Sequence, residues 1–459
     1  MFTIPDIAAI TGGRIIGEAD GEVTGISTDS RTVTAGELFV PLCGERFDGH
    51  DFIESVPGQG VQAVLAAESW LAHHEPDTQT SCIAVEDTLR AMGDLAAAYR
   101  RRFDIPLVGI TGSNGKTTCK EMLATILEQI GRGLKTAGNL NNMIGLPLML
   151  FRLNSAHAWS VLEMGMSEPG EIDRLAEIAA PRVGVVLNAF PAHLESMGSV
   201  ENVARAKGEL LLCLKPGGCS VVNSDDPLIA VLPVPTGVRR ISFGLGSADV
   251  RATGIENCGI RGQRFCLHIE EEVLSVKLAA FGRHTIYNAL AAAAAAHALG
   301  VPPEIIVNGL EMFRPYDKRF QLEEVNGLVL IDDSYNANPA SLGAALATLG
   351  DLKGGSRAFV ALGDMLELGA NEDELHRTAG AQAAQVSDRL YLYGTNSSRI
   401  AEGAISAGMP TSGVRQGLSH EQIAADILTR ASQGDFVLVK GSRGMKMEKV
   451  AEGIRAHRR

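Results

Sequence analysis

The sequence lacks the cysteine pairs that hold many small folds together. Its seven cysteines are odd in number and widely scattered, and no two of them form a Cys-x-x-Cys pair. Neither a disulfide framework nor a zinc knuckle is therefore indicated. A reducing compartment fits this cysteine usage, and we expect a cytoplasmic protein.

The sequence also lacks a long apolar run and an excess of basic residues. No uninterrupted apolar stretch reaches the roughly 18 residues of a membrane-spanning helix. Residues 1–10 carry Asp6 but no Lys or Arg, whereas a signal peptide begins with basic residues. We therefore expect neither export nor a membrane span. The 41 Lys and Arg against 54 Asp and Glu give a net charge of −13, so nucleic acid is not an expected partner and any phosphate must be bound locally.

The remaining composition is that of a globular protein of several domains. The chain has 459 residues, of which 45% are hydrophobic and 21% are charged. At roughly 150 residues per domain, this length predicts about three domains. Glycine is unusually frequent, with 51 residues where an average share is about 7%. Many backbone positions are therefore expected to need the conformations that glycine allows.

The order of apolar runs predicts an α/β fold in three domains. Residues 1–82 are typical of a small α/β unit, and residues 83–313 of a central domain with a mostly parallel sheet. Residues 314–459 predict a doubly wound, Rossmann-like α/β domain. The helix expected over 88–103 is assigned to the central domain. Between about 239 and 280 the sequence is strand-like without helices, which predicts an antiparallel extension of the central sheet.

Short apolar strands alternate with helices in both larger domains. The expected central strands are 105–111, 159–164, 183–188 and 220–223, and the expected helices are 116–130, 171–179, 200–214 and 285–299. The C-terminal strands are 328–332, 358–362, 390–393 and 436–440, and the helices are 341–349, 374–386, 420–432 and 445–456. Ligands of such sheets bind beyond the carboxyl ends of the strands.

The strongest motif is the string Val108-Gly-Ile-Thr-Gly-Ser-Asn-Gly-Lys-Thr-Thr118, between an expected buried strand and an expected helix. This context is typical of a phosphate-binding loop, in which turn amides and a helix N-terminus face the phosphates. Lys116 would place a positive charge between them, and the Thr117 hydroxyl could bind Mg²⁺. Ile110 stands where the commonest form of the motif has its first glycine. The predicted nucleotide-binding residues are Gly112, Ser113, Asn114, Gly115, Lys116, Thr117 and Thr118.

Further polar residues follow neighbouring strands of the expected central sheet. Glu163 ends one strand, where an acid would complete a shell of oxygen ligands around Mg²⁺. His193 follows the next strand; a lone histidine is more often structural, but the nearby Glu163 and Thr117 favour a ligand role. Lys207 lies on the following expected helix, where periodicity alone indicates a solvated side chain.

Together these strings resemble the Mur ligases of peptidoglycan synthesis. The resemblance covers essentially the whole chain in order, and it includes the loop at 111–118 and Gly138-Asn-Leu-Asn-Asn142. It continues with Asp332-Asp-Ser-Tyr-Asn-Ala-Asn-Pro339, Gly363-Asp-Met-Leu-Glu-Leu-Gly369 and Lys440-Gly-Ser-Arg443. The strings at 332–339 and 363–369 resemble the branch that joins D-alanyl-D-alanine to UDP-N-acetylmuramoyl-tripeptide. The resemblance implies an N-terminal UDP-binding domain, a central ATPase and a C-terminal domain for the incoming amine, and we expect a monomer.

The resemblance also implies catalytic roles. Lys207 matches the lysine that Mur ligases commonly carry as a carbamate, which helps to hold a second Mg²⁺ with His193 as a further ligand. Arg319 matches the cation that reaches the γ-phosphate. The usual Pro-Gly-Arg lead-in reads Tyr316-Asp-Lys-Arg319 here, so Lys318 could take that role instead.

Nucleotide and substrate contacts follow from the same resemblance. Asn288 matches the adenine contact, and Asp333 with Asn336 matches the nucleotide contacts of the C-terminal domain. The implied substrate-binding residues are Ser27, Asp29, Ser30, Arg31, Phe47, Asp48, Gly49, His50, Asn139, Asn141, Asn142, Asn338 and Asp364.

The implied reaction is amide formation driven by ATP. The terminal carboxylate of the tripeptide attacks the γ-phosphate to form an acyl phosphate, and the amine of D-alanyl-D-alanine then displaces phosphate. Lys116, Arg319 and two Mg²⁺ ions would offset the negative charges that meet in this step. The metal-binding and catalytic set would include Thr117, Glu163, His193 and Lys207.

Two other functions stay open. A related ATP-dependent ligase, of the MurE or the folylpolyglutamate type, would share the phosphate loop. The MurE branch has Asp-Asn-Pro-Arg where this sequence has Ala337-Asn-Pro-Ala340, and folate enzymes lack the UDP-binding domain. A P-loop switch or motor would need a guanine-specific string such as Asn-Lys-x-Asp, which the sequence lacks. No motif distinguishes lysine from diaminopimelate as the third residue of the accepted peptide.

Overall fold

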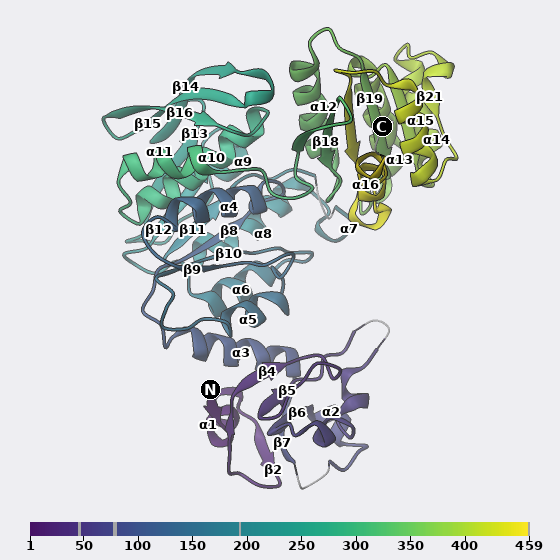
Figure 1. Ribbon diagram of the computed structural model, residues 1–459. Helices are drawn as coiled ribbons and strands as arrows, with labels where there is room; N and C mark the ends of the chain where they lie inside the picture. Colours follow the sequence, from purple (N-terminus) through teal and green to yellow (C-terminus); the bar gives the residue numbers. More distant parts are fainter. Residues whose placement is uncertain (45–46, 77–79, 192–193, 458–459) are drawn as a thin grey trace. The chain divides into compact units, whose positions relative to one another are not determined.

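The computed structural model describes residues 1–44, 47–76, 80–191 and 194–457 (Figure 1). Predicted ligand His193 lies outside these residues. The described residues divide into two units, one made of 1–109, 131–166 and 170–182 and the other of the remainder. Helices and strands alternate along most of the chain, which confirms the predicted α/β fold class.

The N-terminal region is built around a sheet of order β2-β7-β6-β5-β4, in which only β2 runs antiparallel to its neighbour. Successive side chains alternate between two cores, because strand residues point to opposite faces. Leu38 and Leu65 pack with helices α1 (Ile4–Thr11) and α3 (Thr88–Arg100), whereas Phe39 and Val64 pack on the other face. The elements are β1 (Phe2–Thr3), α1 (Ile4–Thr11), β2 (Arg14–Ile16), β3 (Glu22–Val23), β4 (Gly25–Ser27), β5 (Glu37–Phe39), β6 (Ala63–Ala67), α2 (Glu68–Leu71) and β7 (Ser81–Val85).

Helix α3 (Thr88–Arg100) packs on the N-terminal sheet and also on α5 (Gly145–Leu150) and α6 (Glu171–Ala179) of the next region. The buried Arg100 guanidinium donates to the carbonyl oxygens of Ala179, Phe103 and Ile105. Arg174 of α6 donates to Asp94 of α3 at 2.5 Å. The sequence assigned this helix to the central domain, but its two apolar faces serve both regions.

The central sheet has the strand order β16-β15-β14-β13-β12-β11-β8-β10-β9. Its strands are β8 (Leu107–Thr111), β9 (Gly133–Lys135), β10 (Trp159–Glu163), β11 (Val183–Val186), β12 (Cys219–Asn223), β13 (Arg239–Gly244), β14 (Val250–Asn257), β15 (Gln263–Ile269) and β16 (Glu272–Leu278). Its helices are α4 (Lys116–Leu127), α5 (Gly145–Leu150), α6 (Glu171–Ala179), α7 (Leu194–Met197), α8 (Val200–Leu212), α9 (Pro227–Ala230), α10 (Arg283–Ala298) and α11 (Pro303–Met312).

The predicted antiparallel extension begins later than the sequence indicated. Strand β13 still pairs parallel with β12, and only β15 runs antiparallel to β14 and β16. Strand β14 also pairs parallel with β13. Part of the difference comes from α9, which the sequence reading missed. A parallel neighbour needs a crossover connection, and α9 lies in the connection between β12 and β13.

Helix α10 contains the alanine-rich stretch of the sequence. Residues 289–296 are completely buried between the sheet and α4, so small side chains allow close packing on all sides. Across the described part of the chain, no helix is both long enough and apolar enough to cross a membrane.

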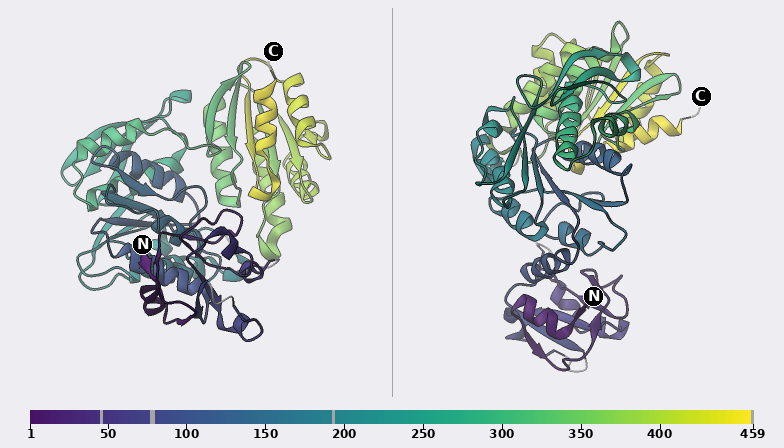
Figure 2. Two further views of the ribbon diagram at one scale, coloured as in Figure 1. Left: turned by 60° about the horizontal axis from the view of Figure 1, so that its bottom comes forward. Right: turned by 90° about the vertical axis from the view of Figure 1, so that its left-hand side faces the viewer.

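The C-terminal region is a doubly wound sheet of order β17-β18-β22-β19-β20-β21, with only β17 antiparallel (Figures 1 and 2). One core lies between the sheet and α12, α13 and α14, and another lies under α15 and α16. The elements are β17 (Gln321–Val325), β18 (Leu328–Asp333), α12 (Pro339–Lys353), β19 (Ala358–Gly363), α13 (Glu372–Val386), β20 (Arg389–Tyr393), α14 (Ser397–Ser406), β21 (Val414–Arg415), α15 (His420–Arg430), β22 (Phe436–Lys440) and α16 (Glu448–Ala456).

Two glycines explain how α13 and α14 come into backbone contact. A Cβ on Gly380 would lie 1.8 Å from the Ile400 carbonyl oxygen, and one on Gly403 would lie 1.9 Å from the Arg377 carbonyl oxygen. Both distances are far inside van der Waals contact. Part of the glycine excess therefore serves helix packing rather than ligand binding.

Candidate active site

The predicted phosphate loop joins β8 to α4, and α4 begins at Lys116. Gly115 precedes the helix with a φ of +90°, and a Cβ there would fall 2.2 Å from Asn288 Oδ1. Only glycine combines this conformation with so close an approach. The loop therefore ends at a helix N-terminus, which favours anions.

The segment after β11 is hydrogen-bonded to the phosphate loop. The Asn114 backbone N–H donates to Asn188 Oδ1 at 2.9 Å, and Asn188 Nδ2 donates back to the Asn114 carbonyl oxygen at 3.0 Å. Ser113 Oγ donates to the Phe190 carbonyl oxygen at 3.1 Å. The sequence reading did not predict this supporting role of Asn188, because the residue stood only as part of the string that leads to His193.

Two cations lie at the loop. Lys116 Nζ donates to the Gly112 carbonyl oxygen at 2.5 Å. Arg319 Nη2 lies 3.4 Å from Thr117 Oγ1, and its guanidinium lies 3.8 Å from the centre of the Tyr335 ring. Lys318 Nζ instead lies 3.9 Å from Glu448 Oε1 on α16. Of the two cations that the sequence left open, Arg319 is the one next to the loop.

Lys207 is buried, in contrast to the solvated side chain that periodicity indicates. It lies on α8 and is only 3% exposed. Burial and the positive charge of Lys116 hold the pKa of Lys207 well below its ordinary value. The neutral form of this amine is therefore favoured. A neutral amine is a nucleophile that can take up carbon dioxide, whereas an ammonium cannot.

Glu163 ends β10 and is buried. Its backbone N–H donates to Thr136 Oγ1 at 2.9 Å, directly after β9. The predicted residues Asn139, Asn141 and Asn142 follow in the same loop. The ends of β9 and β10 thus carry both the predicted metal ligand and the predicted asparagine set.

These asparagines shape their own loop. Asn142 Oδ1 accepts from the Gly145 backbone N–H at 2.8 Å, at the start of α5. The Asn141 carbonyl oxygen accepts from the Gly165 backbone N–H at 2.8 Å. Asn139 is exposed.

Polar residues also gather at the carboxyl ends of the C-terminal strands. Asp333 Oδ2 accepts from Lys440 Nζ at 2.5 Å, and its Oδ1 accepts from the Phe320 backbone N–H at 3.1 Å. The Asn336 carbonyl oxygen accepts from Lys440 Nζ at 3.0 Å. Both carboxylate oxygens of Asp333, a predicted nucleotide contact, therefore have protein partners. Lys440 connects Asp333 with Asn336.

Two predicted substrate residues lie at the same edge of the C-terminal sheet, after β18 and β19. Asn338 caps α12 by accepting from the Ser341 backbone N–H, and its Nδ2 donates to Asn114 Oδ1 at 2.8 Å. Asp364 is buried after β19, where its Oδ2 accepts from Thr395 Oγ1 and from the Asn396 backbone N–H, both at 3.0 Å.

The predicted N-terminal substrate residues lie after β4 and in the turn that contains His50. Ser27 ends β4, and Ser30 accepts at its carbonyl oxygen from Gln59 Nε2. Arg31 donates to both carboxylate oxygens of Asp29, and these hydrogen bonds lower the pKa of Asp29 to about 2. The turn itself contains the exposed Phe47, followed by Asp48, Gly49 and His50.

The fold and the loop define a class of protein before any comparison is made. A strand, a glycine turn, a lysine and a helix N-terminus on a mostly parallel sheet form a phosphate-loop nucleotide-binding domain. Here that domain is followed by a doubly wound domain. Family descriptions match all three regions: "Mur ligase family, catalytic domain" at residues 22–100, "Mur ligase middle domain" at 110–296 and "Mur ligase, glutamate ligase domain" at 318–443.

The chain belongs to the Mur ligase family. It is 35% identical to the UDP-N-acetylmuramoyl-tripeptide–D-alanyl-D-alanine ligase of Bacillus subtilis (strain 168), over 98% of each chain. It is 36% identical to the protein of the same name from Escherichia coli (strain K12), again over 98% of each.

The chain also resembles solved structures over nearly its whole length. A crystal structure of MurF from Acinetobacter baumannii matches with a TM-score of 0.89 at 33% identity, covering 99% of each chain. A structure of MurF ligase from Thermotoga maritima in complex with ADP matches with a TM-score of 0.83 at 29% identity, covering 94% of this chain and 97% of that one. These matches confirm the resemblance and the three-region α/β architecture.

Proposed function

We propose that the protein is an ATP-dependent amide ligase that joins D-alanyl-D-alanine to UDP-N-acetylmuramoyl-tripeptide, giving the pentapeptide nucleotide, ADP and phosphate. The observation that carries this proposal is the loop at 112–118. Lys116 lies there at a helix N-terminus, and its positive charge acts on the buried Lys207. The printed names of the full-length relatives support the choice of substrates. A monomer in the cytoplasm is part of the same proposal.

The first chemical step forms an acyl phosphate. The terminal carboxylate of the tripeptide attacks the γ-phosphorus of ATP, the bond to the β,γ-bridging oxygen breaks, and ADP leaves. Lys116 and Arg319 lie at the loop where negative charge accumulates, and fixed cations there stabilise the transition state.

The second step forms the amide. The free amine of D-alanyl-D-alanine attacks the acyl carbon, the amine loses a proton, and the tetrahedral intermediate collapses with release of phosphate. Asn338 and Asp364 are the proposed contacts of this dipeptide, and Asp333 with Asn336 the proposed nucleotide contacts on the C-terminal side. Asn288, next to Gly115, is the proposed adenine contact.

The proposed metal ligands fit Mg²⁺ by the chemistry of their donor atoms. The hydroxyl of Thr117 and the carboxylate of Glu163 are hard oxygen donors of the kind that this ion prefers. A neutral, buried Lys207 fits a carbamate, which would add carboxylate oxygens to the set. His193 is the fourth proposed ligand. Two bound ions would neutralise charge on the phosphates.

The remaining assignments concern the domains. The UDP end of the substrate is proposed to bind within residues 1–82, at Ser27, Asp29, Ser30, Arg31, Phe47, Asp48 and Gly49, with His50 in the same turn. The ATP site is proposed for 83–313, with the asparagines at 139–142 beside the peptide, and the amine site for 314–459.

The test is phosphate release by the full-length protein with ATP, Mg²⁺ and UDP-N-acetylmuramoyl-tripeptide, offering D-alanyl-D-alanine and L-lysine in parallel. We expect release with the dipeptide only, and none from Lys116→Ala. Lys215→Ala, an exposed lysine just beyond α8, is the matched control and should behave as wild type. Release with L-lysine and not with the dipeptide would contradict the proposed branch.

A further inference from the structure

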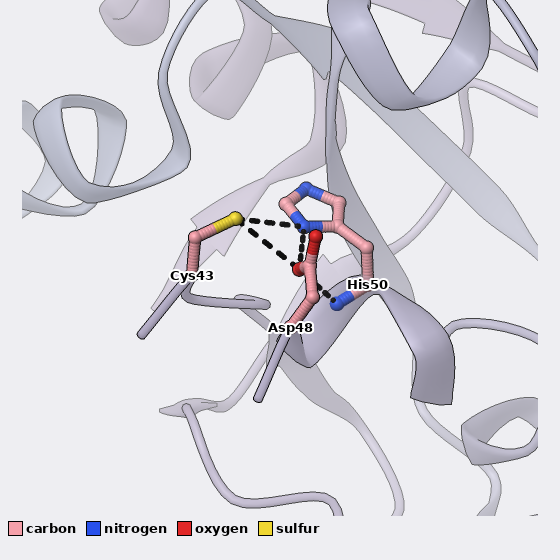
Figure 3. A group of neighbouring side chains, drawn as sticks. All are labelled: Cys43, Asp48 and His50. Carbon is pink, nitrogen blue, oxygen red and sulfur yellow. Dashed lines mark hydrogen bonds and ion pairs between the residues drawn. The ribbon is translucent and has the colours of Figure 1, made fainter. Parts of the chain in front are cut away.

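Three side chains with metal-binding chemistry meet in the N-terminal region. Cys43 Sγ lies 3.2 Å from Asp48 Oδ1 and 3.7 Å from His50 Nδ1, and Asp48 Oδ1 lies 2.6 Å from His50 Nδ1 (Figure 3). Thiolate, carboxylate and imidazole are all zinc ligands. A metal centre is therefore the first interpretation of this cluster, but the hydrogen bonds of the histidine argue against it.

The protonation of His50 follows from its two ring contacts. The side chain is only 2% exposed, and its Nε2 accepts from the Ala67 backbone N–H of β6 at 3.1 Å. An accepting Nε2 carries no proton, so the neutral ring must carry its proton on Nδ1. Nδ1 then donates to Asp48 and has no lone pair for a metal. Binding a metal there would require an imidazolate or the loss of the Ala67 hydrogen bond.

Asp48 is held by one of its two oxygens. Its Oδ1 accepts from the Cys43 thiol, from the His50 backbone N–H at 2.9 Å and from His50 Nδ1. Burial alone would raise the pKa of Asp48, but the hydrogen bonds from His50 and Cys43 outweigh it and lower the pKa below its ordinary value. The carboxylate is therefore ionised near neutral pH.

The second oxygen of Asp48 is available to a ligand. The Asp48 side chain is 46% exposed, and no hydrogen bond to its Oδ2 occurs within the described residues. An ionised carboxylate oxygen repels a pyrophosphate but accepts from N–H and O–H donors. The donors at the UDP end of the proposed substrate are the imide N–H of the uracil and the ribose hydroxyls.

We propose that His50 is a positioning residue, which fixes the Asp48 carboxylate so that Oδ2 accepts a hydrogen bond from the uridine part of the nucleotide substrate. His50 itself does not touch the substrate, since it is buried and both of its ring nitrogens are engaged. This inference rests on the proposed function, because the UDP-linked substrate supplies the ligand.

The variant Asp48→Asn tests the roles of the two carboxylate oxygens separately. Asparagine keeps an oxygen that accepts from both N–H groups of His50, but it presents an amide group to the ligand. We expect the KM for UDP-N-acetylmuramoyl-tripeptide to rise about tenfold or more, which is the loss of one charge-assisted hydrogen bond. The kcat should stay unchanged, because this cluster does not contact the reacting atoms.

The variants His50→Gln and His50→Asn each remove one of the two hydrogen bonds of the His50 ring. Glutamine can keep the acceptor for the Ala67 N–H but loses the Nδ1 donor to Asp48, so the KM should rise with little change in Tm. Asparagine keeps a donor to Asp48 but leaves the Ala67 N–H without a partner, so the Tm should fall more than the KM rises. His73→Gln, an exposed histidine on the same region, is the control that should change neither.

The decisive measurement is a double-mutant cycle in the full-length protein. If His50 acts through Asp48, His50→Gln should not raise the KM further in the Asp48→Asn background. An equal rise in both backgrounds would overturn the inference, and so would one equivalent of tightly bound Zn²⁺ that Cys43→Ser abolishes.

Calorimetry with UDP alone keeps this inference separate from the ligase proposal. A wild-type protein without ligase activity would contradict the proposed function, and the same pattern of affinities for UDP would still support the role of His50. A wild-type protein that does not bind UDP would overturn the inference.

Discussion

Lys440 and Asp333 form a buried ion pair at the ends of two neighbouring parallel strands. Lys440 Nζ lies 2.5 Å from Asp333 Oδ2, and the lysine is only 2% exposed. The register of β18 and β22 sets the two residues directly opposite each other. Because Asp333 also accepts from the Phe320 backbone N–H, the pair fastens the segment that carries Arg319 to the C-terminal sheet.

Breaking this pair should destabilise the C-terminal region. Lys440→Met leaves a carboxylate with no cation in a largely buried place, and such a loss costs about 3 kcal/mol or more. We expect a clear fall in the free energy of unfolding, measured by urea denaturation followed by circular dichroism. The double variant Lys440→Met with Asp333→Asn should recover part of the loss. Lys449→Met, at an exposed lysine of α16, is the control, and an equal effect there would refute the explanation.

Lys207 provides a chemical test of the proposed carbamate. Lys207→Ala should lower kcat about 100-fold or more, since the metal site would lose a ligand. Added formate or acetate should restore part of the phosphate release, because a free carboxylate can occupy the space of the missing carbamate. Lys215→Ala should show neither loss nor rescue. A fully active Lys207→Ala would exclude the carbamate.

His284 predicts a pH dependence of stability. Burial lowers the pKa of His284 from 6.5 to about 4; the charge of Asp333 opposes this shift and that of Lys440 adds to it. The unfolded state therefore binds a proton more readily than the folded state. The stabilising contribution is complete above pH 6.5 and is lost as the pH falls from 6.5 to about 4.

The variant His284→Gln isolates this contribution. Between pH 7 and pH 4, wild type should lose about 1 to 3 kcal/mol more unfolding free energy than the variant. Urea denaturation at a series of pH values measures the difference, and His73→Gln serves as the control. Parallel pH curves for wild type and His284→Gln would show that His284 does not titrate in this way.

Gly380 predicts a packing effect that runs against helix propensity. Alanine is favoured over glycine inside a helix by about 1 kcal/mol, yet a Cβ at Gly380 would collide with the Ile400 carbonyl oxygen. We expect Gly380→Ala to lower the stability by about 1 to 3 kcal/mol through overpacking. Gly343→Ala, in α12, meets only an ordinary contact at 3.5 Å and should raise the stability. Thermal unfolding of both variants gives the comparison, and a stabilised Gly380→Ala would disprove the close packing.

Several elements of the fold could be predicted because their signals are local. The helix at 171–179 and the strand at 436–440 agree with α6 and β22 residue by residue. Short or shared elements were harder. The crossover helix α9 has too few residues for a periodic pattern, so the prediction did not show that β13 pairs parallel with β12. The contacts of helix α3 with both the N-terminal sheet and helices α5 and α6 could not be predicted, because a sequence does not reveal which neighbours cover each face of a helix.

The sequence by itself determined the α/β architecture, the phosphate loop at 112–118 and the resemblance to Mur ligases, because each is written in contiguous strings and in the period of apolar residues. Only the tertiary structure decided that Lys207 is buried, that Lys440 neutralises Asp333 and that His50 supports Asp48. Each of these depends on a side chain meeting a partner from another element. Burial and charge neutralisation arise from contacts between elements that are distant in the sequence, and no local sequence pattern encodes such contacts.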